Sequence, residues 1–435
     1  MLIAPSSYGA LSATSANTIK GNAPTIQNNR LGFKVNGASY SQAIGNIDPS
    51  VAKAFDAGLS FSHFKVMDLT SADYYDADGD VAHSTTPFTT GTKSIKWYDS
   101  NDTEITDMTK TLGCGNNYSL PLKLRIEIQD VEVHSKYGDP RDSSPTTLSK
   151  EYLISPASGI CYIKPGSLTW YDSNGTHLSG SSLRDPTTGG GYTSDFDPNK
   201  GFKAQPTESR DKFPTTGFPG AKFQLVMSSS SSSYNFTITS YPQSVAKVDA
   251  NGWVTLKSKP ESAVTVRATL KTSPSIYFDY TFNPTDLWIV PKRSAGVNYA
   301  SATASCGTDV IDGIANTPKI PTRADLSNAP QIAHAVNSPV PTSYFTRAIG
   351  KIYEKDAQGN LTNNVLVKES IFGEWGRTIP GFYPESYFYN RDHFTYTRDV
   401  HPPISGYQFQ YCAVVGNGRF NKCYTIGDYY YTCLG

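Results

Sequence analysis

The cysteines are the residues of this sequence whose chemistry is easiest to name. None is spaced as Cys-x-x-Cys, so the spacing does not support a zinc ribbon or a thioredoxin-like redox site. Their number is even and three fall in the last two dozen residues, which favours three disulfides formed in an oxidising compartment. The six are Cys114, Cys161, Cys306, Cys412, Cys423 and Cys433.

No arrangement typical of a catalytic site occurs. None of the seven histidines is followed by glutamate, Gly-x-Ser-x-Gly is missing, and Gly350-Lys351 continues into isoleucine rather than the Ser or Thr of a phosphate loop. The acidic stretch Asp76 to Asp80 could hold calcium, but it lacks a distal bidentate glutamate, so a solvated turn is favoured by roughly four to one. We expect no enzyme, no metal and no cofactor.

Composition limits the partners and the fold class. The 38 Lys and Arg residues balance 38 Asp and Glu, so no long-range field attracts nucleic acid or an anionic membrane surface. The 435 residues include four methionines but many Ser, Thr, Tyr, Gly and Pro, which is typical of short strands joined by turns. No apolar run approaches the ~20 residues of a membrane-spanning helix, and the start lacks the features of a signal peptide. A mainly β protein of about three domains is predicted.

The pentapeptide WYDSN occurs twice, at 97–101 and at 170–174. Aromatic residues suit a pleated strand, and Asp and Asn close turns with their own side chains, so each copy predicts a strand that runs into a tight turn. The repeat indicates two related β modules or two hairpins of one β domain. Shared ancestry is favoured over chance by roughly three to one.

Local patterns predict further elements along the chain. Residues 1–28 lack periodicity and are predicted to be a flexible lead. A helix is predicted at 48–58, with Asp48 as its cap. Residues 122–134 alternate between apolar and polar and predict the clearest long strand. The glycine-rich stretch at 181–201 predicts a long loop or linker.

Residues 244–270 alternate around an Asn251-Gly252 turn and predict a hairpin, so the serines at 228–233 are predicted to form a loop inside an Ig-sized sandwich. The letters VAKVDANGWVTLK and AVTVRATL within this hairpin resemble the bacterial Ig-like domain of the invasin and intimin adhesins. The preceding letters FPTTGFPGAKF are similar to the same family.

The C-terminal segment resembles the C-type-lectin-like adhesion domain of that family. ASATASCGT predicts a helix that carries Cys306, and IPTRADLSNAPQIAHAV predicts a second helix with Thr322 as its cap and Asp325 in its first turn. Aromatic strands, a hairpin and a last strand with the final cysteine follow. The resemblance covers residues 210–435 and is closest to the invasin E type adhesion region of the invasin/intimin (inverse autotransporter) family.

The resemblance implies a domain order and a disulfide pairing. The order is a flexible lead at 1–28, β-rich modules at 29–205, an Ig-like β-sandwich at 206–285 and a C-type-lectin-like α+β domain at 286–435. The pairing is Cys306 with Cys433 and Cys412 with Cys423, which leaves Cys114 for Cys161. This last bridge would join the two WYDSN hairpins into one covalently linked β unit.

Three tripeptide motifs of related binding proteins are missing. The calcium-binding triplets Glu-Pro-Asn and Trp-Asn-Asp of sugar-binding C-type lectins do not occur, and neither does Arg-Gly-Asp. Calcium-dependent glycan binding and integrin binding through Arg-Gly-Asp therefore have no support from motifs.

Aromatic residues are concentrated near the C-terminus. Between Ile371 and Gly435, 17 of 65 residues are Phe, Tyr or Trp, against 12% for the whole chain. Some must form the core, but tyrosine and arginine also anchor protein interfaces. For any single residue, a role in covering the β domain is about twice as frequent as a contact role. The candidate contact residues are Tyr383, Tyr387, Tyr389, Arg391, Asp392, His393, Arg398 and Tyr429.

The resemblance implies an adhesin fragment that binds a host receptor, protein or glycan, through its lectin-like head. It also implies an extracellular location, either secreted or displayed on the outer membrane of a Gram-negative bacterium, and a role in virulence. Two alternatives stay open. One is a secreted protein that partners with an intimin-like outer-membrane β-barrel, and the other is a glycan-binding lectin.

Overall fold

The chain forms two compact units in the computed structural model. The first comprises residues up to 55, 59–110 and 119–155, and the second comprises 56–58, 111–118 and 156–435. The structure describes residues 21–114, 118–292, 295–331, 339–340, 342–355, 357–358, 361–389 and 393–435. No helix in these ranges is long and apolar enough to cross a membrane.

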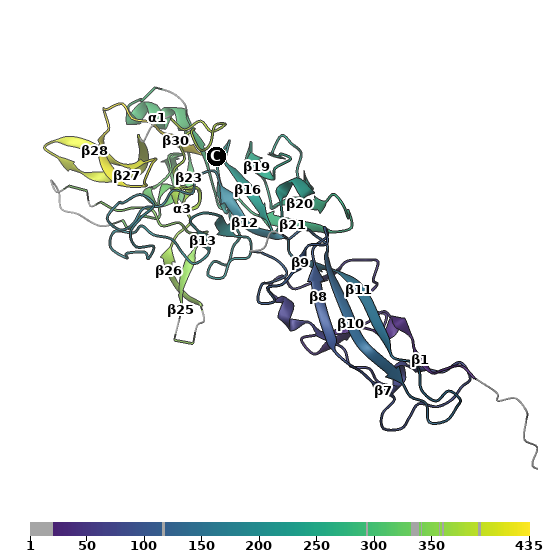
Figure 1. Cartoon of the computed structure of the whole chain (residues 1–435). Helices are drawn as coiled ribbons and strands as arrows, with labels where there is room; N and C mark the ends of the chain where they lie inside the picture. The colour runs from purple at the N-terminus through teal and green to yellow at the C-terminus, as the bar shows by residue number, and fades with distance from the viewer. Residues whose placement is uncertain are drawn as a thin grey trace, which may run out of the picture. The chain divides into compact units, whose positions relative to one another are not determined.

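The first unit is built around one long strand. β10 (Leu122–Val133), predicted from its alternation, buries every second side chain and pairs with β8 and β11, which lie on either side of it (Figure 1). This sheet has the order β4-β11-β10-β8-β9, and β7 also pairs with β10. The other strands of the unit are β1 (Thr25–Ile26), β2 (Phe33–Val35), β3 (Ala38–Tyr40), β4 (Lys53–Phe55), β5 (Lys65–Val66), β6 (Tyr74–Tyr75), β7 (Phe88–Thr89), β8 (Lys93–Tyr98), β9 (Glu104–Ile105) and β11 (Thr146–Pro156).

Two predictions for the first unit are wrong. Residues 48–58 form no helix, because the Asp48 carboxylate accepts hydrogen bonds from the backbone N–H and the hydroxyl of Ser50, and the chain then enters β4. A short polar side chain that bonds to the nearby backbone offers the chain a turn in place of a helix. The predicted flexible lead is wrong at its end, where residues 25–26 form β1, which pairs with β6, while residues 1–20 lie outside the described residues.

The second unit contains a β-sandwich. A six-stranded sheet, β13-β14-β12-β16-β19-β18, faces the three-stranded sheet β17-β20-β21. Phe223 and Phe282 pack between them with ring centroids 5.1 Å apart. The strands are β12 (Ile160–Pro165), β13 (Phe196–Asp197), β14 (Gly201–Lys203), β16 (Lys222–Met227), β17 (Tyr234–Ile238), β18 (Ala246–Val248), β19 (Trp253–Leu256), β20 (Val264–Leu270) and β21 (Tyr277–Phe282).

The sandwich corrects one predicted boundary. β12 and β14 precede residue 206, yet they belong to the same sheet as β16, so the boundary between 205 and 206 falls inside a sheet. The serine run connects β16 to β17, as predicted, through a short 3-10 turn at Ser231–Ser233. The hairpin predicted around Asn251-Gly252 is formed by β18 and β19.

The C-terminal part combines small sheets with three short helices. α1 (Tyr299–Cys306) carries Cys306, and α2 (Arg323–Leu326) has Thr322 as its cap and Asp325 in a capping box, as predicted, although α2 is only four residues long. The remaining elements are β15 (Thr216–Gly217), β22 (Leu287–Pro291), β23 (Thr308–Ile311), β24 (Ile314–Pro318), β25 (Ile352–Lys355), β26 (Leu361–Val367), α3 (Ile371–Trp375), β27 (Phe394–Ile404), β28 (Tyr407–Val414), β29 (Phe420–Tyr424) and β30 (Thr432–Leu434).

Disulfides and one shared strand connect these elements. β22 pairs in parallel with β15 and antiparallel with β30, so the segment that enters the sandwich and the last strand share one sheet. The three disulfides are the pairs that the resemblance implies, namely Cys114–Cys161, Cys306–Cys433 and Cys412–Cys423. The predicted mainly β fold class is confirmed.

The repeated pentapeptide encodes a turn. In both copies the aspartate carboxylate, from Asp99 or Asp172, accepts the backbone N–H groups two and four residues later. Asp249 makes the same two bonds in the sequence DANGW, without the Trp-Tyr pair. The fourth residue of each turn has a positive φ, at Asp102, Gly175 and Gly252.

This turn explains part of the repeat. The two WYDSN copies lie in different compact units, so they do not belong to one covalently linked β unit as predicted. Because the same turn recurs at a third site that shares only the Asp and the Asn, local turn chemistry accounts for these two letters and not for the Trp-Tyr pair.

A buried polar network joins distant segments of the second unit. The Glu374 carboxylate, fully buried on α3, accepts hydrogen bonds from the backbone N–H and hydroxyl groups of Thr215 and Thr216 and from the Gly350 N–H. Burial raises the pKa of Glu374 to about 7, although these hydrogen bonds act in the opposite direction.

Arg347 extends this network. Its buried guanidinium donates to the carbonyl oxygens of Ser167 and Thr169, each at 2.9 Å, and to that of Glu374 at 2.8 Å. Burial lowers the pKa of Arg347 to about 10, so the side chain stays charged at neutral pH. A Cβ atom at Gly376, where φ is 68°, would lie 2.2 Å from Nη1 of Arg347, so only glycine fits there.

The turn gives a first prediction. Replacing Asp172 by alanine removes both carboxylate bonds to the backbone and should lower the free energy of unfolding by about 1–2 kcal/mol. Asp172→Asn keeps an acceptor oxygen and should cost less. Urea denaturation of the oxidised chain measures both, and equal losses for the two variants would contradict the role of the acceptor.

The network gives a second prediction. Between pH 4.5 and about 7 the unfolded chain releases the Glu374 proton while the folded chain keeps it, so the free energy of unfolding falls as pH rises. The glutamine side chain of Glu374→Gln does not titrate, so the fall in the free energy of unfolding across this pH range should be smaller by roughly 3 kcal/mol in the variant. Denaturation at a series of pH values tests this, with Glu261→Gln, at an exposed glutamate of the same unit, as the control. An unchanged pH slope in Glu374→Gln would refute it.

Candidate binding surface

The aromatic residues of the C-terminal part divide between the core and the surface. Tyr383 is fully buried, and its hydroxyl donates to the Trp375 carbonyl oxygen at 2.5 Å and accepts from the Ser167 N–H at 3.1 Å. Burial raises the pKa of Tyr383 well above its usual range. Tyr383 therefore supports the Glu374 network, and its prediction as a contact residue is wrong.

The tyrosine run at 429–431 alternates between the two sides of the chain. Tyr429 packs against Tyr396 with ring centroids 5.3 Å apart, and the Tyr431 hydroxyl bonds to Ser305, so both face the core around the Cys306–Cys433 disulfide. Tyr430 points the other way and stacks on Tyr389 with ring centroids 4.2 Å apart.

This alternation corrects another predicted contact residue. Tyr429 and Tyr430 are both half-buried, but Tyr429 packs against the core cluster, whereas Tyr430, which the prediction omitted, packs on the exposed ring of Tyr389. The sequence contained a signal for the side on which each tyrosine lies, because Cys433 was expected to be buried by its disulfide. Residues an even number of positions from Cys433 in an extended chain share its side, which assigns Tyr429 and Tyr431 to the core.

Three aromatic rings form what we call the tyrosine cluster: Tyr389, His393 and Tyr430. The His393 ring lies 4.9 Å from the ring of Tyr389 and 4.8 Å from that of Tyr430. Tyr389 is 39% exposed, and nearby in sequence Tyr387 is 53% exposed. The cluster thus brings together two predicted residues, Tyr389 and His393, and exposes the Tyr389 ring while His393 and Tyr430 are half-buried.

The remaining predicted residues lie elsewhere. Arg391 and Asp392 lie outside the described residues. Arg398, on β27, forms an ion pair with Asp312, with Nη2 and Oδ2 3.1 Å apart. Its partner is thus a carboxylate of the β23–β24 connection and not a member of the tyrosine cluster.

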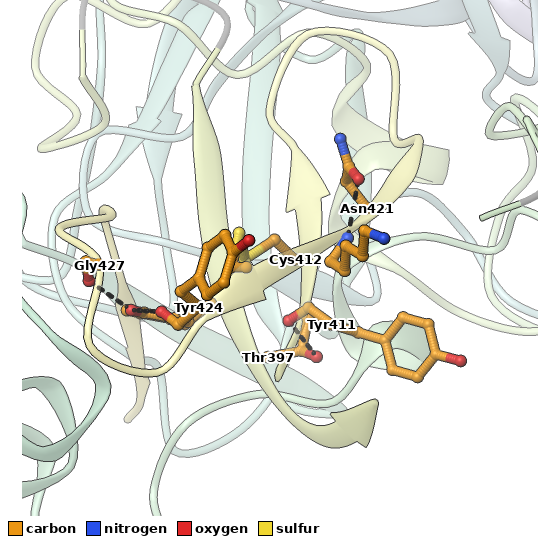
Figure 2. The surroundings of a disulfide bond; sticks show 9 residues. Thr397, Tyr411, Cys412, Asn421, Tyr424 and Gly427 are labelled. Carbon is orange, nitrogen blue, oxygen red and sulfur yellow. Dashed lines mark hydrogen bonds between the residues drawn. A yellow bond between two sulfur atoms is a disulfide. The ribbon is translucent and has the colours of Figure 1, made fainter. Parts of the chain in front are cut away.

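A second exposed aromatic pair lies on the β28–β29 hairpin, and it was not predicted. The rings of Tyr407 and Tyr424 are 5.8 Å apart, and both are about half-exposed. Figure 2 shows Tyr424 next to the Cys412–Cys423 disulfide. The Tyr396 hydroxyl lies within hydrogen-bond distance of the carbonyl oxygens of Tyr424 and Gly427, which fixes the end of β29.

These surfaces are suited to binding. Among the described residues, no group of three or more His, Cys, Asp or Glu is placed to hold a metal ion. The rings of the tyrosine cluster are held by the strands that carry them: the Tyr396 N–H donates to the Tyr430 carbonyl oxygen at 3.0 Å, and the Val415 N–H to that of His393 at 3.1 Å. Rigid aromatic side chains offer large contact area at a small loss of conformational entropy.

Measurements of stability test which side of the chain each tyrosine occupies. Tyr429→Ala should lower the free energy of unfolding by about 2–4 kcal/mol, because it leaves a void beside the Cys306–Cys433 disulfide. Tyr389→Ala removes an exposed ring and should cost less than about 1.5 kcal/mol. Both are measured by urea denaturation of the oxidised chain. Equal costs, or a larger cost for Tyr389→Ala, would contradict the assignment of the two faces.

Comparison with known proteins gives one match to a family profile. Residues 194–282 match the profile described as Invasin, domain 4. This range covers β13 to β21 and thus most of the sandwich, and it begins before the predicted boundary at 206. No curated protein matches the sequence.

Solved structures of two adhesins are also similar to the chain. Invasin, described as a bacterial integrin-binding protein, has 15% identity and a TM-score of 0.40, and the match covers 94% of this chain and 60% of the invasin chain. A C-terminal intimin fragment in complex with the intimin-binding domain of the translocated intimin receptor, Tir, has 16% identity and a TM-score of 0.33, with coverage of 80% and 86%. The chain is thus invasin-like over residues 194–282, where its resemblance to the invasin/intimin adhesin family is confirmed.

Proposed function

We propose that this protein acts outside the cell as an adhesin that binds a protein on a host cell surface through the tyrosine cluster. One observation carries the proposal: the exposed ring of Tyr389 stacks on the half-buried ring of Tyr430, on a disulfide-linked frame that directly follows an invasin-type segment. Tyrosine is enriched among residues that dominate the binding energy of protein interfaces.

The setting of the cluster supports this role. Tyr430 lies three residues before Cys433, whose disulfide closes a loop of 127 residues back to α1. Tyr389 and His393 pack on Tyr430 from the chain that enters β27. A surface that is fixed before binding loses less conformational entropy when the partner arrives. Three disulfides and no free cysteine among the described residues favour an oxidising, extracellular environment.

The partners of the similar proteins suggest a class of partner. Invasin is an integrin-binding protein, and the intimin fragment was solved in complex with the intimin-binding domain of Tir, so both of these partners are proteins. We therefore propose a protein receptor rather than a glycan for this chain. Display on an outer membrane, a role in virulence and partnership with a β-barrel are further proposals that follow from the same resemblance.

Binding of the complete oxidised chain to epithelial cells tests the proposal. Labelled protein should bind saturably by flow cytometry, and Tyr389→Ala or Tyr430→Ala should weaken binding at least tenfold, which is about 1.4 kcal/mol. Tyr137→Ala, at an exposed tyrosine of the first unit, is the matched control and should bind like the wild type. The complete chain is needed because a fragment starting at residue 286 would lack the Thr215 and Thr216 partners of Glu374.

Two outcomes would contradict the proposal. Unchanged binding by both cluster variants would place the contact surface elsewhere. Loss of binding after enzymatic removal of cell-surface glycans, with resistance to protease treatment of the cells, would identify a glycan ligand instead.

A further inference from the structure

Arg184 is a partly buried cation whose hydrogen-bonding groups are not all used. It lies in the loop before Gly189, and its Nε atom is buried without a hydrogen-bond partner among the described residues. Burial lowers the pKa of its guanidinium. The neighbouring Asp185 carboxylate accepts the N–H groups of Thr187 and Thr188, at 2.6 and 3.0 Å. A buried polar atom with no partner in a native fold calls for an explanation, and a ligand supplies one.

The Arg184 side chain lines a cavity of about 300 Å³, which we call the Arg184 pocket. Its walls include residues 327–331, the end of β26 and Lys368, and among the described residues no carboxylate lines it. The Asn328 side chain donates to and accepts from the backbone of Thr346. The charged donors of the pocket are the side chains of Arg184 and Lys368, and two cations suit a carboxylate ligand.

The pocket lies beside an unpaired strand edge. β26 pairs with β25 and with no other strand among those described, so its second edge is open. Val365 and Leu366 are adjacent in sequence, yet they are 38% and 43% exposed, so both faces of the strand reach solvent. Figure 1 shows the β25–β26 hairpin extending away from the rest of its unit. Open edges with exposed apolar side chains are sites where another chain can add a strand.

We propose that an extended acidic segment of a partner protein adds along the open edge of β26 and places one Asp or Glu carboxylate on Arg184 in the Arg184 pocket. Backbone hydrogen bonds to β26 would supply affinity, and the Arg184 pocket would select the acidic side chain. This site uses no residue of the tyrosine cluster, so it does not depend on the proposed function.

The lining favours a peptide over an acidic sugar. The residues around the Arg184 pocket include no aromatic ring on which a sugar ring could stack. They do include the backbone of β26 and the exposed side chains of Val365 and Leu366, which match the alternating side chains of an extended peptide. The charge of the site and its strand edge thus indicate the same kind of ligand.

Selection of a random heptapeptide library on the complete chain tests the proposal. Enriched peptides should carry Asp or Glu at one fixed position, with β-branched residues at alternate positions. The most enriched peptide, labelled with fluorescein, should lose at least tenfold in affinity on Arg184→Gln and at least threefold on Lys368→Gln. Arg141→Gln, at an exposed arginine of the first unit, is the control. Hydrogen exchange should show protection of the β26 amides by the peptide.

Each alternative outcome is distinct. Enrichment without a fixed acidic position, or affinity that survives Arg184→Gln, would overturn the proposal. So would 3′-sialyllactose binding that depends on Arg184 while no peptide is enriched, because the ligand would then be an acidic sugar. The cluster variants separate this inference from the proposed function. If they lose cell adhesion but still bind the peptide, the peptide site is supported independently of the adhesion surface.

Discussion

The second unit depends on one buried carboxylate. Glu374 cannot be placed in a dry interior unless donors surround it, and here those donors come from two segments far away in sequence, Thr215–Thr216 and Gly350. Arg347 fixes the backbone carbonyl of the same residue while it also binds the chain near Ser167. The invasin-type sandwich and the disulfide-linked C-terminal part are therefore one structure, because neither can satisfy these groups alone.

Features encoded by neighbouring residues could be predicted from the sequence. The alternation of apolar and polar residues predicts β10. Thr322, followed three residues later by Asp325, predicts the helix cap. The failed helix at 48–58 shows the limit of such patterns. Its apparent start was an Asp48–Ser50 turn, and its only well-buried apolar residue is Phe55, on a strand. The predicted boundary between 205 and 206 failed for a different reason, since pairing between strands before and after residue 206 has no local signature.

The candidate surface was predicted in part. Aromatic enrichment drew attention to the C-terminal part, and the rings of Tyr389 and His393 do lie together. Composition cannot say which tyrosines face inward, because that depends on the strand register, and Tyr383 and Tyr429 were misassigned for this reason. The pairing of Arg398 with Asp312 joins residues 86 positions apart and could not be foreseen.

The buried carboxylate also has a kinetic consequence. β16 and β19 are close in sequence and can pair early in folding. The hydrogen-bond partner of Thr215, Glu374, lies 159 residues later in the chain, so this bond forms late. The chain loses conformational entropy when it closes such a long loop, and it loses this entropy before the hydrogen bonds across the loop can form. Contacts between residues distant in sequence therefore slow folding in general. During synthesis or export, the N-terminal part of the second unit thus emerges with unpaired polar groups, and cooperative folding of the unit begins only when α3 arrives.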